Sequence, residues 1–265
     1  MKFTNRYIKS LIIILLIMII ISTIFYLYSS KKREYFTEDK VVFIIPSTSR
    51  NMNYENVASC SLVNILYESL KKLDISRYTF VIGIDDDDEF YNKNIDELKA
   101  TLPDNFHLKF LNNYDKSYVC IVNQLADIAI NEYHAEYLHI FADDLNVYEL
   151  DYINKFIEWF KQNDYLGLGW GIDEGNDKIC THPFLSKNHV NYLGYFYPST
   201  IKNWYCDDWV TSVYEKLNRV VKSDRSVIHN EIIATDSNRY NIVNIEKEKM
   251  DQLVNDAVNI LSNNT

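Results

Sequence analysis

The sequence contains few of the residues that usually mark turns, with 6 glycines and 4 prolines among 265 residues. Loops must therefore depend largely on Asn, Asp and Ser, which tolerate turn conformations. Basic residues are also few, because 27 Lys and Arg face 37 Asp and Glu and the formal net charge is −10. Proteins that bind nucleic acid hold its phosphates with clustered Lys and Arg. The composition therefore argues against a nucleic-acid partner.

The cysteines are equally sparse. Cys60, Cys120, Cys180 and Cys206 are far apart, and no two of them form a C-x-x-C pair. This spacing supports neither a zinc ribbon nor a dense disulfide scaffold. Buried free thiols are the simplest expectation, and a bridge between Cys180 and Cys206 stays open as an alternative.

The length and the hydrophobic content favour one folded domain. With 47% hydrophobic residues, a chain of this length can bury one ordinary core but not two large ones. We expect that domain to occupy residues 40–265.

An almost unbroken apolar run lies near the amino terminus, from Leu11 to Leu27. At about 1.5 Å per residue in a helix, this length reaches the lower end of a membrane span. We predict a transmembrane anchor over residues 11–28, between a tail of residues 1–10 and a tether of residues 29–39. A cleaved signal peptide is the alternative, but basic residues follow the run where small residues would mark a cleavage site.

The orientation of this anchor is not fixed by its flanks. Basic residues stand on both sides of the run, so the positive-inside rule favours neither orientation. Because the polar motifs described below all follow the run, we predict a single-pass, type II-like membrane protein with its domain on the lumenal side.

Beyond residue 40, apolar runs of strand length alternate with helical patterns. Short connections between such elements are typical of a parallel sheet covered on both faces. The predicted strands are residues 41–45, 78–84, 107–111, 137–141 and 166–170, and the predicted helices are residues 62–70, 119–130, 152–162, 209–217 and 250–261.

Three of the first four strands end in polar or acidic residues. These are residues 47–50, residues 85–88, and the pair Asp143 and Asp144. In a parallel sheet, ligands bind beyond the carboxyl ends of the strands. An acidic pair there can hold a hard divalent cation through its oxygens, which a negatively charged diphosphate would need before it could approach.

A second acidic pair, Asp207 and Asp208, opens the helix predicted at residues 209–217. A carboxylate in that place could remove the proton from a hydroxyl group. His229 follows a short apolar run and is placed to return as a further metal ligand.

Each acidic group also has a structural interpretation. Asp143 and Asp144 could cap the helix predicted at residues 152–162, although that helix begins at Tyr152, eight positions after Asp144. The run Asp85–Asp88 could be a solvated turn, the usual place of like-charge clusters. Asp207 or Asp208 could cap the helix that follows them.

The order of these features, from Val41 to about His229, resembles the nucleotide-sugar glycosyltransferases of the GT-A fold. The resemblance lies in their first two strands with the nucleotide loops, the helix and strand that lead into a D-x-D motif, the acceptor segment, and the motif with the catalytic carboxylate. The corresponding segments here are residues 43–50, 82–88, 122–126, 141–144, 182–187, 193–196, 207–209 and 214–219.

This resemblance implies an α/β fold of the GT-A, Rossmann-like type, with a mostly parallel sheet flanked by helices after one transmembrane helix. It implies that Asp144 and His229 hold Mn²⁺ or Mg²⁺, and that Asp208, or Asp207 in its place, is the catalytic base. The residues implied in donor binding are Pro46, Ser47, Thr48, Arg50, Asp85, Asp86, Asp87, Asp88, Asn123 and Asp143.

One residue departs from the family's pattern. Ala142 stands at the first position of the D-x-D motif, so ribose contact would pass to Asp143 or to the run Asp85–Asp88.

The reaction that the resemblance implies is a metal-dependent glycosyl transfer of the hexosyltransferase type. The donor would be a nucleoside diphosphate sugar, with UDP preferred, and the acceptor a hydroxyl of a glycan, glycoprotein or glycolipid. A base positioned for in-line attack favours inversion at the anomeric carbon. The alternatives are an inactive membrane-anchored protein that binds nucleotide or carbohydrate, and another metal-dependent enzyme such as a nucleotidyltransferase or phosphohydrolase.

Overall fold

The computed structural model describes residues 18, 39–113, 115–231, 239–241 and 243–264. The chain divides into two units, Met1–Asp39 and Lys40–Thr265. The predicted anchor at residues 11–28 lies outside the described residues apart from Met18, and the tether at residues 29–39 apart from Asp39. Among the helices that the structure describes, none is long and apolar enough to cross a membrane.

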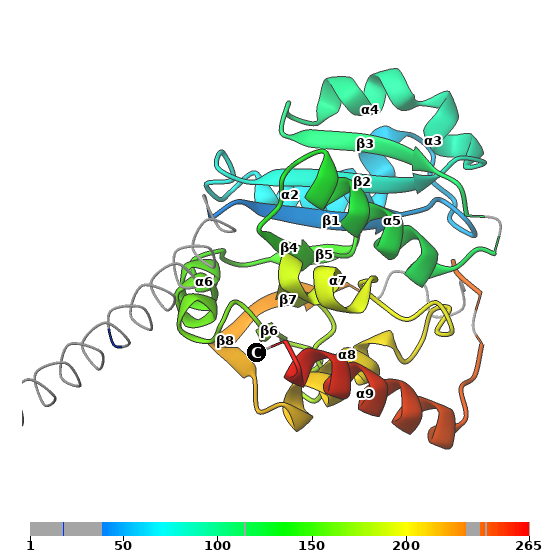
Figure 1. The fold of residues 1–265 in the computed structure, drawn as a ribbon. Coiled ribbons are helices and arrows are strands. Elements are labelled where there is room, and N and C mark those ends of the chain that lie inside the picture. The colour runs from blue at the N-terminus through cyan, green and yellow to red at the C-terminus, as the bar shows by residue number, and fades with distance from the viewer. Residues whose placement is uncertain (1–17, 19–38, 114, 232–238, 242, 265) are drawn as a thin grey trace, which may run out of the picture. The chain divides into compact units, whose positions relative to one another are not determined.

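The described part of the second unit contains one sheet of eight strands, in the order β3-β2-β1-β4-β7-β6-β8-β5 (Figure 1). The strands are β1 (Val41–Ser47), β2 (Thr79–Asp85), β3 (Phe106–Leu111), β4 (Tyr137–Ile140), β5 (Leu145–Val147), β6 (Leu168–Asp173), β7 (Pro183–Ser186) and β8 (Val220–Asn230).

The sheet is mixed. Strands β3, β2, β1 and β4 pair in parallel, as the alternating pattern predicted. In the other half the prediction of a mostly parallel sheet holds only for β6 and β8, which pair in parallel, because β7 pairs antiparallel with both β4 and β6, and β5 pairs antiparallel with β8. The reason is that a loop without a helix joins β6 to β7, and such a connection reverses the chain, whereas parallel strands need a longer crossover.

Helices cover the sheet, and those predicted from the sequence are present. They are α2 (Glu68–Leu70), α3 (Glu89–Lys93), α4 (Ile95–Thr101), α5 (Tyr118–Asn131), α6 (Tyr152–Gln162), α7 (Lys187–Leu193), α8 (Cys206–Lys216) and α9 (Lys247–Ser262), with a 3₁₀ turn at Val57–Ser59 and a π-helical segment at Leu62–Tyr67.

Alternate residues of the central strands build two core layers. Val42 and Ile44 of β1 belong to the cluster that α5, α7, α8 and α9 complete, on the face seen in Figure 1. Phe43 lies on the opposite face, where its ring stacks on Phe80 with the centroids 4.7 Å apart, and Phe80 stacks on Phe106 at 4.4 Å. Burial on both faces explains why β1 and β2 are continuous apolar runs.

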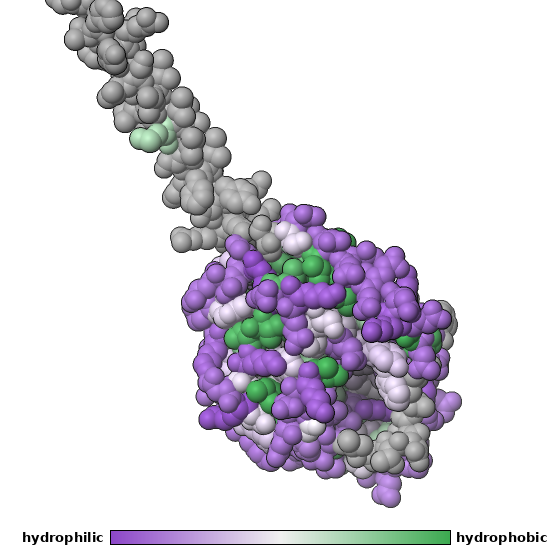
Figure 2. All heavy atoms as spheres, turned by 90° about the horizontal axis from the view of Figure 1, so that it is seen from below, coloured by the Kyte–Doolittle hydropathy of each residue, from purple (hydrophilic) through white to green (hydrophobic). Residues whose placement is uncertain are grey.

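Hydrophilic residues cover most of the face shown in Figure 2, and hydrophobic residues appear there in small groups among them. All four cysteines are free thiols, so the alternative bridge between Cys180 and Cys206 is not formed.

Candidate functional site

The parallel half of the sheet brings three polar segments to one edge. Register pairs Ser47 at the end of β1 with Ile84 of β2, and Ile44 with Ile140 of β4. The residues that follow these strands, namely 48–50, 85–88 and 143–144, therefore come together beyond the carboxyl ends. This is where a parallel sheet binds its ligands.

Asp143 is deeply buried at this edge, with 1% of its surface exposed. The Ser47 hydroxyl donates a hydrogen bond to Asp143 Oδ2 at 2.6 Å, and Ser47 Oγ lies 2.8 Å from the Tyr91 hydroxyl. Since the single Ser47 proton is given to Asp143, the Tyr91 hydroxyl must donate to Ser47. These two residues fix the orientation of Asp143 from the inside of the fold.

Arg239 holds the acidic pair from the other side. Its Nη1 donates to Asp143 Oδ1 at 2.8 Å and to Oδ2 at 3.0 Å, and its Nη2 donates to Asp144 Oδ2 at 3.2 Å. Sequence reasoning missed this residue, and no local signal could have revealed it, because 95 positions separate it from Asp144. The alternative that the pair caps a helix is wrong, because α6 begins after Asp151 instead.

Burial changes the acidity of Asp144. Loss of contact with water and the neighbouring Asp143 charge raise the pKa of this carboxyl, Arg239 opposes both, and the result is a pKa of about 7. Two carboxylates that share a site resist joint ionisation unless a cation accompanies them. The edge is therefore built to hold positive charge.

The residue that contacts Asp144 just after β8 is Glu231, whereas the sequence predicted His229. The Glu231 amide donates to the Asp144 carbonyl at 3.0 Å, and the Glu231 carboxylate accepts from Asn146 at 2.6 Å. His229, two residues earlier, has its Nδ1 3.8 Å from Asp173 Oδ1. The role of His229 as a metal ligand stays a prediction.

The acidic pair fits a divalent cation that shares its ligands with a substrate. Among the described residues, no three His, Cys, Asp or Glu side chains converge into a complete metal cage. Mg²⁺, however, commonly binds through one or two carboxylates and takes its other ligands from phosphates and water. Asp143 and Asp144 supply such carboxylates, and in the structure they already hold a cationic group, the Arg239 guanidinium.

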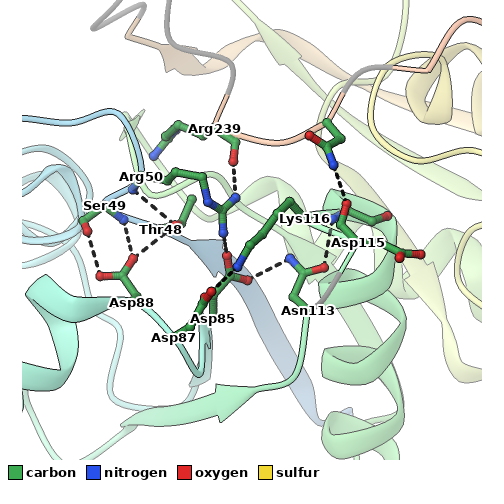
Figure 3. Close-up of polar contacts among 12 residues, drawn as sticks. Thr48, Ser49, Arg50, Asp85, Asp87, Asp88, Asn113, Asp115, Lys116 and Arg239 are labelled. Carbon is green, nitrogen blue, oxygen red and sulfur yellow. Dashed lines mark hydrogen bonds and ion pairs between the residues drawn. The ribbon is translucent and has the colours of Figure 1, made fainter.

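A polar network joins Arg239 to the loops after β1 and β2 (Figure 3). Arg50 forms an ion pair with Asp85 and donates to the carbonyl oxygen of Arg239. Asn113 Nδ2 donates to Asp85 Oδ1 at 2.8 Å. Asp85 is 1% exposed, so this carboxylate is held between Arg50 and Asn113 largely away from water.

The rest of the run Asp85–Asp88 is a turn, as its structural interpretation predicted. Asp86 is exposed, and Asp87 forms an ion pair with Lys116. Asp88 caps α3 by accepting from the Tyr91 amide at 3.1 Å and also accepts from the Ser49 amide at 2.7 Å.

Several residues implied in donor binding also make contacts within the fold, and their role in donor binding stays a prediction. Pro46 and Ser47 are buried in β1, and the Thr48 hydroxyl donates to Asp88 at 3.1 Å. Asn123 is occupied as well, because its Oδ1 accepts from the Phe196 amide at 2.9 Å and its Nδ2 donates to the carbonyl of Tyr197 at 2.8 Å. The alternation of side chains along β1 and the buried face of α5 turn these polar groups toward the fold.

The second acidic pair lies in the first turn of α8, and neither member caps it, because the residue before the helix is Tyr205. Asp208 is exposed, whereas Asp207 is partly buried. Burial raises the pKa of Asp207 to about 7, the contact with Cys206 lowers it, and the Asp208 charge raises it.

Tyr118, at the start of α5, relates this pair to the first. Burial raises the pKa of its hydroxyl well above the usual value, and the charges of Cys206, Asp207, Tyr240 and Asp144 raise it further. The charges of Asp207 and Asp144 therefore both act on the Tyr118 hydroxyl.

Comparison with known proteins supports the fold. No protein-family model and no curated protein matches the sequence. The structure is similar to that of S. aureus TarS, residues 1–349, in complex with UDP-GlcNAc, with a TM-score of 0.53 and 12% identity over 83% of this chain and 72% of that chain.

A second similar structure is the mannosyltransferase PcManGT from Pyrobaculum calidifontis, in complex with GDP-Man and Mn²⁺. Its TM-score is 0.55 at 11% identity, over 80% of this chain and 65% of that chain. The predicted resemblance to the GT-A fold is confirmed: this is a mixed α/β protein whose sheet and flanking helices resemble that fold.

Proposed function

We propose that the protein is a glycosyltransferase that binds a nucleoside diphosphate sugar at the edge formed by β1, β2 and β4. The observation that carries this proposal is the buried Asp143–Asp144 pair, which holds a cationic group at the carboxyl end of β4. Similar folds with bound UDP-GlcNAc, and with bound GDP-Man and Mn²⁺, support it. The finer proposal is a hexosyltransferase with UDP as the preferred nucleotide and a glycan, glycoprotein or glycolipid acceptor.

Two parts of the site would divide the donor between them. Asp85, held by Arg50 and Asn113, lies where a nucleoside could be bound through its hydroxyl or amide groups. Asp143 and Asp144 lie where the diphosphate must be neutralised. A bound Mn²⁺ or Mg²⁺ would offset the charge that develops on the leaving diphosphate.

We infer that Asp207 is the base, with Asp208 as the alternative. A general base works best when its pKa lies near the working pH, and burial places the pKa of Asp207 at about 7. Asp207 would take the proton of the acceptor hydroxyl while the hydroxyl oxygen bonds to the anomeric carbon. The bond from that carbon to the diphosphate oxygen breaks, and in-line attack inverts the carbon.

The proposal is tested by measuring products and binding together. Incubation with UDP-sugars, Mn²⁺ and a mixed acceptor pool should release UDP, whereas sugar 1-phosphate in place of UDP would identify a nucleotidyltransferase, which transfers UMP to the acceptor, or a phosphohydrolase, which transfers it to water. Binding of UDP-sugar without any release would identify the inactive binding protein.

Calorimetry addresses the metal separately. UDP should bind more tightly with Mn²⁺ than in excess EDTA, because two carboxylates otherwise repel the diphosphate. Asp144→Asn should weaken the Mn²⁺-dependent part of UDP binding by about tenfold or more, since one tenfold step is only about 1.4 kcal/mol. Equal affinity for UDP in Mn²⁺ and in EDTA would refute the role of the metal.

A further inference from the structure

Arg239 lies outside the helices and strands, and its guanidinium group is held by several hydrogen bonds. Its guanidinium makes three hydrogen bonds to two carboxylates, and 19% of the side chain is exposed. The partner Asp143 is 1% exposed. Paired bonds of this kind are the strong form of the arginine–carboxylate interaction.

The short segment from Arg239 to Asn241 is held at both of its ends, by Arg239 at the acidic pair and by Asn241 at the loop before α5. The Asn241 amide donates to the Lys116 carbonyl at 2.8 Å, and Asn241 Nδ2 donates to the Asp115 carbonyl at 2.7 Å. Between them, the Tyr240 ring packs edge-on against Tyr118, with the centroids 5.6 Å apart. The segment therefore lies across the loop before α5 and presents the Arg239 side chain to the acidic pair.

The carbonyl of Arg239 binds the second part of the site. It accepts a hydrogen bond from Arg50, the residue that is paired with Asp85 (Figure 3). Arg50 also lies over the Tyr240 ring, 5.9 Å from its centroid. One residue thus contacts the proposed diphosphate position through its side chain and the proposed nucleoside position through its backbone.

Charge decides what can share the acidic pair with Arg239. Two ionised carboxylates and one guanidinium sum to −1, from −2 and +1. A divalent cation added beside the guanidinium would make that sum +1 in a largely buried place, whereas a cation that replaces the guanidinium makes it zero. The cation and the guanidinium would also require the same carboxylate oxygens.

We propose that Arg239 and a divalent cation bind the Asp143–Asp144 pair in mutual exclusion. Arg239 is a tethered cation that occupies the pair in the free protein and must turn away before Mn²⁺ or Mg²⁺ can enter. The inference deepens the proposed function and rests on it for the identity of the cation.

This exclusion couples the cation to the donor. A guanidinium displaced from two carboxylates needs another anionic partner, and the diphosphate of the donor would supply one next to the same place. The cation alone should therefore bind weakly, and the cation with the donor should bind well.

The test is a calorimetric titration of the full chain with MnCl₂ in the absence of nucleotide. Arg239→Gln removes the competing charge and should lower the Kd for Mn²⁺ by about tenfold or more, because unit charges this close interact strongly even at an effective dielectric constant near 20. Arg239→Lys keeps the charge but loses the three-bonded fork, so its Kd should lie between those of the wild type and Arg239→Gln.

Arg225→Gln is the matched control. Arg225 is an exposed arginine paired with Glu149, and its replacement removes the same charge outside the site. The Kd for Mn²⁺ in this variant should equal that of the wild type.

An unchanged or higher Kd in Arg239→Gln would overturn the proposal, and so would the absence of Mn²⁺ binding in both proteins. If Arg239→Gln does not fold by circular dichroism, Arg239→Lys decides, and an unchanged Kd there overturns it. Because no nucleotide is present, these outcomes are independent of whether UDP is bound or released, which tests the proposed function itself.

Discussion

Replacement of Ser47 by alanine tests how the fold orients the acidic pair. The Ser47 hydroxyl links Asp143 to Tyr91, and both Ser47 and Tyr91 are about 1% exposed. Ser47→Ala removes the hydrogen bond to Asp143 Oδ2 and leaves the buried Tyr91 hydroxyl without its partner.

The expected size of the effect follows from these two losses. A hydrogen bond to a charged group is worth about 1.5–3 kcal/mol, and a buried hydroxyl without a partner costs about 1–3 kcal/mol. Asp143 keeps its bonds from Arg239, which places the first loss at the low end. We expect the free energy of unfolding to fall by about 2.5–4.5 kcal/mol.

Tyr91→Phe is the matched comparison, because it removes only the hydroxyl that donates to Ser47. Asp143 keeps its bond from Ser47, so the loss should be smaller, about 0.5–1.5 kcal/mol. The two effects should not add in the double variant, since both remove the same Ser47–Tyr91 contact. Urea unfolding with unchanged m-values measures all three. A Ser47→Ala protein within about 0.5 kcal/mol of the wild type, the range of ordinary surface substitutions, would refute this account of the site.

Two further predictions concern the base and the amino terminus. Because a base acts in its deprotonated form and burial raises the pKa of Asp207 to about 7, turnover should rise with pH through about 7 and then level off. Asp207→Asn should lower kcat by about 10² or more with donor affinity preserved, and a wild-type kcat in Asp207→Asn with a loss in Asp208→Asn would transfer the role to Asp208. The apolar run Leu11–Leu27 should remain in the mature chain as one membrane span. Carbonate extraction should leave the chain in the membrane fraction, and protease should digest the domain in intact vesicles only after detergent is added. A full-length chain in the soluble fraction would contradict the anchor. Digestion of the domain without detergent would show that the orientation is opposite to the predicted one.

The sequence predicted the parallel half of the fold because that half depends on local patterns. Strands β1 and β2 are continuous apolar runs, and α5 shows a clear helical period, so each could be recognised within its own segment. Strand β8 was missed, since Val220–Asn230 mixes charged and apolar residues and derives its place from pairing with β6 and β5. Such pairing joins distant segments and leaves no local period.

In the site too, features that follow local patterns could be predicted, and features set by distant contacts could not. The acidic pair after β4 could be predicted, because polar residues that end a buried strand must meet the other strand ends of a parallel sheet. Which of the polar residues point inward could not be predicted, and Ser47, Thr48 and Asn123, whose donor contacts stay predictions, bind other parts of the fold. Arg239 could not be predicted at all, because its position is set by the path of the chain after β8.

Although Arg239 is distant in sequence, it supplies the positive charge that the acidic pair at the end of β4 requires. Burial and the Asp143 charge together raise the pKa of Asp144 to about 7, so ionising both carboxylates at the end of β4 opposes folding unless a cation joins them. Arg239 supplies one positive charge, which leaves one negative charge uncompensated at the edge of the sheet. That residual charge would repel a diphosphate by itself and attract a divalent cation. The arrangement that lets the free protein fold around two carboxylates therefore also leaves the site ready to exchange a guanidinium for a metal when the donor arrives.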